Sequence, residues 1–324
     1  MQQLGPKVRI FRSAQALVQA RQLWESILKE RPHTVFQRFD LNLLAAQMFA
    51  GREEPFIVCA ESSCGAAIVP AAICRQSGLL RLLGEELFDY RCFLHQGGAD
   101  VLYPAIVELS RCGRPLEIVA VREDDVAAHP QDLPLSPFCG APAARCADID
   151  AGQFAAKNSR LARNLRRLAR LGFAPRRYAG DYPGLVRFIY EKKAAQGPLS
   201  LFHDPLRVEF MVQAAMMLPD VFEIFTLEDE ASIAAAVLCL RDRGCRRFYT
   251  GWFAPELERH SPALSLICEV TRLSLAEGLD CDYMTGDQPY KQRLATSSTP
   301  LYRVRASARQ LAEAGSLAHA LPAA

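Results

Sequence analysis

The sequence lacks the patterns of a membrane-spanning, metal-binding or disulfide-bonded protein. No apolar run approaches the roughly 20 residues that cross a bilayer, and Met1 to Arg12 contain no apolar signal-peptide core. The 11 cysteines form no C-x-x-C pair, and their odd number is typical of buried free thiols in a reducing compartment. The histidines show no metal-ligand spacing. We therefore expect a cytoplasmic protein with no metal site.

Two enzyme signatures are also missing, and lysine is scarce. There is no G-x-S-x-G motif of a hydrolase and no glycine-rich loop of the kind that holds nucleotide phosphates. Basic and acidic residues number 38 and 36, a balance that excludes a protein coated all over by nucleic acid. Nearly all the basic residues are arginine, which draws attention to the few lysines, Lys291 among them.

Length and charge distribution predict two domains. At 324 residues, with 50% hydrophobic and 23% charged residues, the composition is that of a globular protein of about two domains. Residues 1–150 carry 15 basic and 18 acidic side chains, whereas residues 151–324 carry 23 and 18. The stretch 129–150 is rich in proline and has no helical or strand periodicity, which is typical of a connector. We place the boundary near residue 150, giving domains 1–150 and 151–324.

Hydrophobic periodicity predicts a mixed α/β fold, in which helices flank a largely antiparallel sheet in each half. In the first half we expect strands at 8–11, 55–61, 66–75, 79–83 and 116–121, and helices at 14–30, 40–50 and 101–110. In the second half we expect helices at 154–171, 182–195, 205–217, 262–277 and 288–295, and strands at 173–178, 221–227, 233–241, 246–253, 281–284 and 301–306. The two halves thus share a coarse order of elements.

The segment 259–264, Arg-His-Ser-Pro-Ala-Leu, gives the sharpest local signal. Ser261 suits a helix N-cap, and Pro262 suits the first helical position, with Ala263 and Leu264 following. This helix is expected to follow a strand directly, so its free amides would face the carboxyl end of that strand. Such a place either binds phosphates or is simply a well-capped structural helix.

A second group of polar residues follows the expected strand at 281–284. Asp287, Tyr290 and Lys291 come within one turn, just after Thr-Gly at the strand end. A carboxylate, a phenol and an ammonium so close together can act as base, acid and oxyanion stabiliser. The alternative is a solvated turn with a local ion pair.

The helix expected at 154–171 carries a basic face. Arginines recur about every three residues, and no acidic residue lies between Asp150 and Asp181. The face could contact tRNA, cofactor phosphates, an anionic glycan or an anionic membrane surface, or it could be a solvated face. No aromatic residues are interleaved, so single-stranded nucleic acid is a poor fit. The basic residues are Lys157, Arg160, Arg163, Arg166, Arg167 and Arg170.

Together these features resemble the GNAT acyltransferase superfamily, most closely its branch of CelD-like (cellulose biosynthesis protein-like) and Fem-type proteins. The resemblance covers about residues 150–310 and rests on the basic helix, the strand at 246–253, the Ser-Pro-x-Leu helix start, the turn at 282–286 and the Tyr290-Lys291 pair. Ala263 stands where many relatives of this branch have glycine. The first half is similar, more weakly, to the N-terminal domain of the same proteins, which implies two GNAT-like domains in tandem.

The resemblance implies acyl transfer from a thioester to an amine, with no permanently bound cofactor. The donor would be acetyl-CoA or another acyl-CoA, and the acceptor an amine of a sugar or of a cell-envelope or exopolysaccharide precursor. Asp287 would position the amine or act as base, Tyr290 would be the acid, and Lys291 would stabilise charge. The donor would be held by Thr250, Gly251, Trp252 and Phe253 on the strand and by Ser261, Pro262, Ala263 and Leu264 at the helix start.

Two rival interpretations stay open. A Fem-like transferase would use an aminoacyl-tRNA as donor and bind the tRNA through Arg160, Arg163 and Arg167. A non-catalytic GNAT-fold subunit of a polysaccharide assembly would bind no acyl donor.

Overall fold

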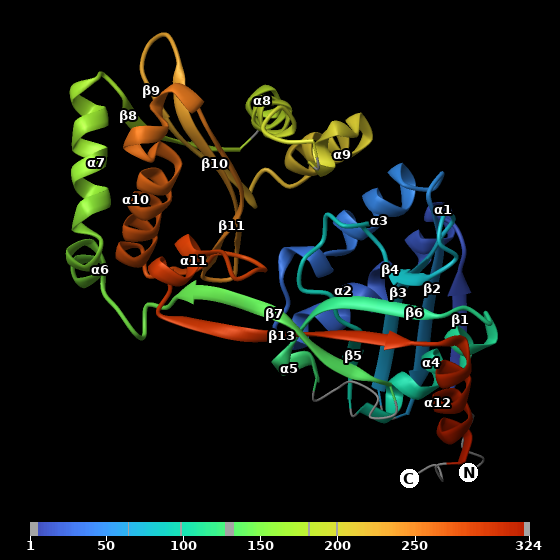
Figure 1. Ribbon diagram of the computed structural model, residues 1–324. Coiled ribbons are helices and arrows are strands. Elements are labelled where there is room, and N and C mark those ends of the chain that lie inside the picture. Colours follow the sequence, from blue (N-terminus) through green and yellow to red (C-terminus); the bar gives the residue numbers. More distant parts are fainter. Residues whose placement is uncertain are drawn as a thin grey trace. The chain divides into compact units, whose positions relative to one another are not determined.

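A computed structural model describes residues 6–63, 65–97, 99–126, 133–180, 182–198 and 200–320. The chain forms two compact units, of which the first comprises Met1–Cys139 together with Pro300–Ala324 and the second comprises Gly140–Thr299 (Figure 1). The division thus lies about ten residues before the predicted boundary. The segment after residue 299 belongs to the first unit, whereas we expected it in the second.

The sheet of the first unit has the strand order β1-β2-β3-β4-β6-β13, and β5 also pairs with β3. Its centre is the long antiparallel hairpin of β2 and β3, which is paired from Glu53 opposite Cys74 to Ser62 opposite Gly65. The strands are β1 (Lys7–Phe11), β2 (Glu53–Ser62), β3 (Gly65–Cys74), β4 (Leu80–Leu82), β5 (Leu94–Gln96), β6 (Leu116–Arg122) and β13 (Ser297–Ala306).

Neighbouring residues of a strand point to opposite sides of the sheet, and here an apolar cluster covers each side. Phe56 and Val58 of β2 pack in one cluster with α4 (Tyr103–Arg111) and α12 (Ala308–Ala320), which lie side by side in Figure 1. Ile57 and Cys59 face the other cluster. The helices near that second face are α1 (Ala14–Leu17), η1 (Val18–Ala20), α2 (Arg21–Glu30) and α3 (Phe39–Met48); the unit also contains η2 (Val35–Gln37), η3 (Ala99–Leu102) and α5 (Glu123–Val126).

The sheet of the second unit has the strand order β7-β12-β11-β10-β9-β8. Each neighbouring pair in this order is antiparallel except β11 and β12, which run parallel. Strand β7 joins the sheet through Ala144 opposite Cys281 and Ala143 opposite Asp282 of β12. The strands are β7 (Leu135–Ala144), β8 (Ala174–Ala179), β9 (Phe222–Glu228), β10 (Ile233–Asp242), β11 (Cys245–Phe253) and β12 (Asp280–Asp282).

Helices flank this second sheet on two sides, as Figure 1 shows. On one side α7 packs against α10, which in turn packs against β9 to β12; on the other side α8 packs against α9 and against β10 and β11. The helices are α6 (Ala151–Lys157), α7 (Ser159–Arg170), α8 (Pro183–Ala194), η4 (Leu201–His203), α9 (Pro205–Met217), η5 (Pro255–His260), α10 (Pro262–Ala276) and α11 (Pro289–Leu294). The prediction of a mixed α/β fold with flanking helices is confirmed.

Three local predictions differ from the structure. The proline-rich stretch expected to be a connector contains the ten-residue strand β7. The single helix expected at 154–171 is two helices, which meet at Asn158, where φ is −105° and the buried side chain donates to the Phe154 carbonyl. Helix α12 was not predicted. No helix in the described part of the chain is long and apolar enough to span a membrane.

Candidate active site

Strands β11 and β12 pair for only three residues and then separate. Their parallel register ends at Arg247 opposite Asp282, which is where β12 itself ends. Strand β11 continues to Phe253, paired with β10 alone. At this point β11 also has a bulge, because Leu238 of β10 lies opposite Thr250 while the next residue lies opposite Phe248, which leaves Tyr249 as the extra residue. Beyond Arg247, one edge of β11 is therefore left without a strand partner.

A buried ion-pair group fixes the point of separation. The Arg247 guanidinium donates to both carboxylate oxygens of Asp242 at 3.1 Å and to Asp282. The other Asp282 oxygen accepts from the Met284 amide at 2.7 Å, and Met284 has a φ of +65°. Burial and the two carboxylates act in opposite directions on Arg247, and the net result is a raised pKa. The carboxylate of Asp282 thus holds the backbone where β12 turns away from β11.

A second buried group ties the same strands to α10. The fully buried Arg246 donates to Glu223 at 2.6 Å, to Glu277 at 3.0 Å and to Ser274. Burial raises the pKa of Glu223, but hydrogen bonds from Arg246 and Arg177 outweigh it and leave the pKa lowered. The Glu223 carboxylate is therefore held ionised and fixed between Arg246 and Arg177.

The turn after β12 is bound to β7 at Gly140. The Gly286 amide donates to the Gly140 carbonyl at 2.9 Å, and the Gly140 amide donates to the Asp287 carboxylate at 3.2 Å. The Gln292 side chain also donates to Asp287, at 3.3 Å. A Cβ atom at Gly140 would lie 2.7 Å from the Asp287 carboxylate and 2.6 Å from the Ser298 hydroxyl, so a larger residue would push these two side-chain ends away. Asp287 itself is exposed.

Tyr290 and Lys291 lie next to each other at the start of α11 but in different surroundings. Tyr290 is 37% exposed, and partial burial raises its pKa. Lys291 is only 7% exposed, and its ammonium donates to the Thr285 carbonyl at 2.6 Å and to the Met284 carbonyl at 3.5 Å. The expected trio is thus present in one segment, with Asp287 and Tyr290 at the surface and Lys291 buried beneath the turn.

The end of β11 expected to hold the donor is partly accessible. Thr250, Gly251 and Phe253 are half-buried, while Trp252 is buried with its ring edge-on to Phe188 at 5.3 Å. The Lys192 ammonium lies over the Trp252 ring, 5.9 Å from its centroid. Trp252 therefore joins β11 to α8 in the core, whereas Thr250, Gly251 and Phe253 keep part of their surface exposed.

Ser261 is the N-cap residue of α10, as predicted, but the expected capping hydrogen bond of its hydroxyl is absent. The short helix η5 lies between β11 and α10, so α10 does not follow the strand directly. Ser261 has a φ of +48° and its hydroxyl caps no amide, because its backbone bridges the two helices instead: its amide donates to the Glu258 carbonyl at 2.8 Å, and its carbonyl accepts from Ser265 at 2.9 Å. Pro262 is the first residue of α10, as predicted, and Ala263 and Leu264 are half-buried behind it.

The arginines of α7 are exposed and have no partner in the described part of the chain. Leu161, Asn164 and Leu168 are buried on the opposite face of the helix. Arginines close by in the sequence are paired: Arg176 lies 3.2 Å from Glu228, and Arg187 lies 2.6 Å from Glu209. The exposed, unpaired residues are Arg160, Arg163, Arg166, Arg167 and Arg170.

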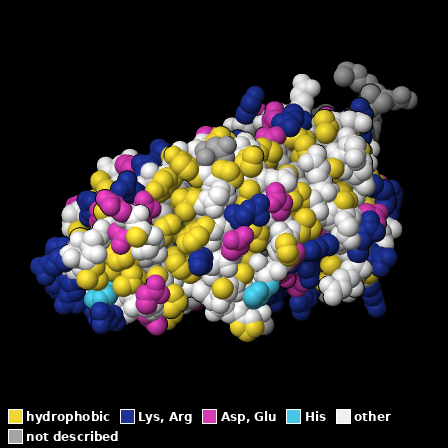
Figure 2. Space-filling model, turned by 90° about the horizontal axis from the view of Figure 1, so that it is seen from above, with side chains coloured by type: hydrophobic (Ala, Val, Ile, Leu, Met, Phe, Trp, Pro, Cys, Tyr) yellow, Lys and Arg dark blue, Asp and Glu magenta, His cyan; other side chains and the backbone are white. Residues whose placement is uncertain are grey.

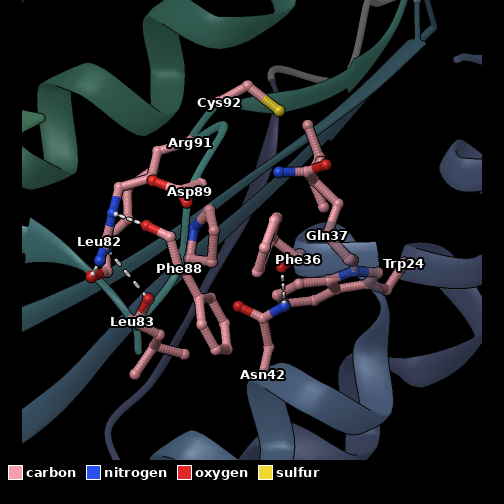
Figure 3. A pocket seen from close by; sticks show the side chains of 12 residues that line it. Trp24, Phe36, Gln37, Asn42, Leu82, Leu83, Phe88, Asp89, Arg91 and Cys92 are labelled. Carbon is pink, nitrogen blue, oxygen red and sulfur yellow. Dashed lines mark hydrogen bonds between the residues drawn. The ribbon is translucent and has the colours of Figure 1, made fainter. Parts of the chain in front are cut away.

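A small cavity lies in the first unit, between Trp24, Phe36 and Phe88 (Figure 3). Its volume of about 20 Å³ is room for one water molecule. The buried Arg91 beside it donates to the carbonyls of Phe88 at 3.0 Å and Leu82 at 2.6 Å, so its guanidinium organises the local backbone. This cavity is too small for a substrate.

Sequence reasoning missed Gly140, Asp282 and Arg247 as parts of the site. Gly140 is 147 residues from Asp287, and no local pattern joins them. Asp282 and Arg247 carry a weak signal, since a charged residue inside an apolar strand is rarely buried without a partner. In the described residues, no group of three or more His, Cys, Asp or Glu side chains could hold a metal ion.

Residues 155–292 match the acetyltransferase (GNAT) domain family. These residues form a GNAT-type domain, and the match does not extend to the rest of the chain. The predictions of a GNAT-type fold and of an acyltransferase are thereby confirmed. The GNAT domain contains the separating strands β11 and β12, the arginine helix α7, and the turn with Asp287, Tyr290 and Lys291.

Solved structures similar to the whole chain share the fold at low sequence identity. The C-terminal domain of a putative lysylphosphatidylglycerol synthetase from Agrobacterium fabrum has a TM-score of 0.60 and 10% identity, covering 92% of this chain and 95% of that one. A tandem GNAT protein from the clavulanic acid biosynthesis pathway has a TM-score of 0.51 and 10% identity, covering 94% and 98%. FemX has a TM-score of 0.53 and 10% identity, covering 87% and 95%. No curated protein matches the chain.

Proposed function

We propose that the protein is an acyl-CoA-dependent N-acyltransferase, with acetyl-CoA as its donor, that modifies an amine of a sugar or cell-envelope precursor. The observation that carries the proposal is the separation of β11 from β12 beyond Arg247 and Asp282, followed directly by the turn that presents Asp287 and Tyr290. The motifs that resemble the CelD-like branch support a role in exopolysaccharide synthesis.

In the proposed reaction the acceptor amine attacks the thioester carbonyl. A C–N bond forms, the C–S bond breaks, the amine proton passes to a base, and the leaving thiolate takes up a proton. Backbone amides of residues 250–253 would polarise the carbonyl, since that edge of β11 has no strand partner. The segment 261–264 would hold the donor phosphates through the free amides of α10.

We assign the proton transfers to the two exposed side chains of the turn. Asp287 would orient the amine and accept its proton, with its own carboxylate held by the Gly140 amide. Tyr290 would protonate the thiolate, and its raised pKa keeps the phenol protonated at neutral pH. Lys291 is a positioning residue in this scheme, because its ammonium is committed to the carbonyls of the turn.

Titration calorimetry with acetyl-CoA and longer acyl-CoAs tests the proposal. We expect the wild-type protein and Tyr290→Phe to bind the donor equally, while turnover with an amine acceptor falls roughly 100-fold in the variant. Tyr182→Phe is the matched control, since Tyr182 is similarly exposed at 41% and lies outside the site.

Two results would contradict the proposal. Absence of acyl-CoA binding together with a salt-sensitive band shift by charged tRNA would favour a Fem-like transferase. Absence of both would favour a non-catalytic subunit.

A further inference from the structure

The arginine face of α7 carries positive charges that form no ion pair in the described part of the chain. By the 100° rotation per residue of an α-helix, its five arginines lie within an arc of about 120° and extend about 15 Å along the axis. They occur at spacings of three and four residues, where like charges repel each other. A carboxylate on the same helix would relieve this repulsion, as Glu269 does for Arg272 on α10, but α7 has none.

The face points outward from the GNAT domain. The helix buries Leu161, Asn164 and Leu168 against α10, and the arginines lie opposite these residues. Figure 2 shows Lys and Arg side chains gathered at the left-hand edge of the view, the side on which α7 lies in Figure 1. A straight row of charges on the outer side of a helix meets a flat surface along its whole length.

We propose that this face docks the protein on an anionic lipid surface. Leu171, which is 51% exposed, directly follows the last arginine as the C-cap residue, and at 100° per residue it falls at the edge of the arginine arc, where it could enter the headgroup region. Apart from the arginines, α7 contains only Ser, Leu, Ala and Asn, so no aromatic side chain of this helix offers a stacking platform for bases. Arginine clusters with an adjacent apolar residue therefore fit a lipid headgroup layer better than a single-stranded nucleic acid.

The neighbouring acidic turn shows which arginines carry the attraction. Gly172 lies next to Asp229, so the end of α7 near Arg170 is close to negative charge. That carboxylate is itself held by the Ala231 and Ser232 amides, at 2.8 and 2.6 Å. Arg160, Arg163 and Arg167 come before this end of the helix and, at 100° per residue, lie within about 60° of one another, so they are the residues to test.

Co-sedimentation of the full-length protein with vesicles tests the proposal. We expect binding to phosphatidylcholine vesicles that contain phosphatidylglycerol, little binding to phosphatidylcholine alone, and weakening by salt. The variant R160Q/R163Q/R167Q should lower the partition coefficient on the order of 100-fold, at about fivefold for each charge removed. The matched control K7Q/K29Q/R114Q removes three exposed charges from the first unit and should change partition less than about twofold.

The apolar contribution is tested separately by Leu171→Ala, with Met216→Ala as control because Met216 is 52% exposed and lies on α9. We expect only the first to weaken binding. Circular dichroism must show that each variant keeps its fold.

The docking proposal stands apart from the proposed chemistry. Acyl-CoA binding and turnover on a free amine should be unchanged in R160Q/R163Q/R167Q, so its failure and the failure of the transferase proposal are distinguishable. Equal binding to neutral and anionic vesicles, or unchanged binding by the triple variant, would overturn it. Loss of a tRNA band shift in the triple variant, without any vesicle binding by the wild type, would assign the face to nucleic acid instead.

Discussion

Lys291 illustrates how burial changes the role that a residue type suggests. A lysine beside an aspartate and a tyrosine fits an oxyanion stabiliser, but here the ammonium is under the turn and donates to the carbonyls of Met284 and Thr285. It therefore supports the backbone that carries Asp287 and Tyr290. Its contribution to turnover, as we infer it, is made through the position of those two side chains.

Lys291→Met keeps most of the side-chain volume and leaves the turn carbonyls without this donor. We expect the free energy of unfolding to fall by about 1–3 kcal/mol, because buried polar groups lose their partner, and turnover to fall with it. Thermal denaturation together with kcat measures both effects. Lys157→Met is the control, because Lys157 donates to the Ala295 carbonyl at 3.3 Å from an exposed position. A large loss of turnover with unchanged stability would show instead that the ammonium acts directly.

Glu53 is a second buried charge, located in the first unit. It is 4% exposed and accepts from the Gly84 and Glu85 amides at 3.2 and 3.1 Å. Burial outweighs the nearby Arg91 and raises the pKa of Glu53 from 4.5 to about 7. Between these values the folded protein binds the proton and the unfolded chain does not.

Stability should therefore be highest below pH 4.5 as far as this group is concerned, and should be lost as the pH rises through 7. The loss attributable to Glu53 is at most about 3 kcal/mol. Denaturant unfolding of wild type and Glu53→Gln at pH 5 and pH 8 measures it. The variant should lose less stability than wild type between the two pH values; an identical pH dependence would show that Glu53 does not titrate there.

The junction of β7 with the turn after β12 fixes the position of the Asp287 side chain. Gly140 lies on β7, a strand that the sequence did not predict because of its prolines. Its amide and carbonyl bind Asp287 and Gly286. The turn thereby gains a fixed position relative to the end of β12.

Gly140→Ala should displace the Asp287 carboxylate, because the new methyl group would lie 2.7 Å from it. We expect turnover to fall roughly 10-fold while acyl-CoA binding is kept, which corresponds to about 1.4 kcal/mol. Gly51→Ala is the control, since a Cβ there meets nothing within 4 Å. In an Asp287→Ala background, the Gly140 substitution should cost much less. An equal loss of turnover in both backgrounds would show that Gly140 does not act through Asp287.

The sequence predicts the elements that have a clear hydrophobic pattern and misses β7, in which prolines interrupt that pattern. The strands β2, β3 and β10, which are short continuous apolar runs, and the amphipathic α7 follow from local pattern. Strand β7 was missed because Pro137 and Pro142 resemble turn residues, although proline is tolerated where its nitrogen faces away from the ladder. The site was predicted as far as one segment carries it, from Asp287 to Lys291. Its contacts to Gly140 and Arg247 depend on tertiary pairing.

The first unit is completed by the end of the described chain. Leu311 and Ala314 of α12 belong to its hydrophobic core, and β13 pairs with β6 from Leu301 opposite Arg122. Each unit also contains one of the two tryptophans, Trp24 in the first and Trp252 in the second, and both are buried. Fluorescence can therefore follow the units separately.

Leu311→Ala should destabilise the first unit by about 2–5 kcal/mol, because Leu311 is fully buried. In a Trp252→Phe background, the unfolding transition reported by Trp24 should move to lower denaturant. In a Trp24→Phe background, Trp252 reports the unfolding transition of the second unit, which should move less. A shift of equal size in both would show that the two units unfold as one.

The return of residues 300–324 to the first unit has a consequence for synthesis on the ribosome. Domains generally fold in the order in which they emerge. Here the residues 140–299 are all made before α12 and most of β13 exist, so the second unit can finish folding first. At 5–20 residues per second, the early part of the first unit waits roughly 10–40 s for its last strand. During that time the edge of β6 and the apolar surface that α12 later covers are open, which makes them targets for a chaperone that binds nascent chains.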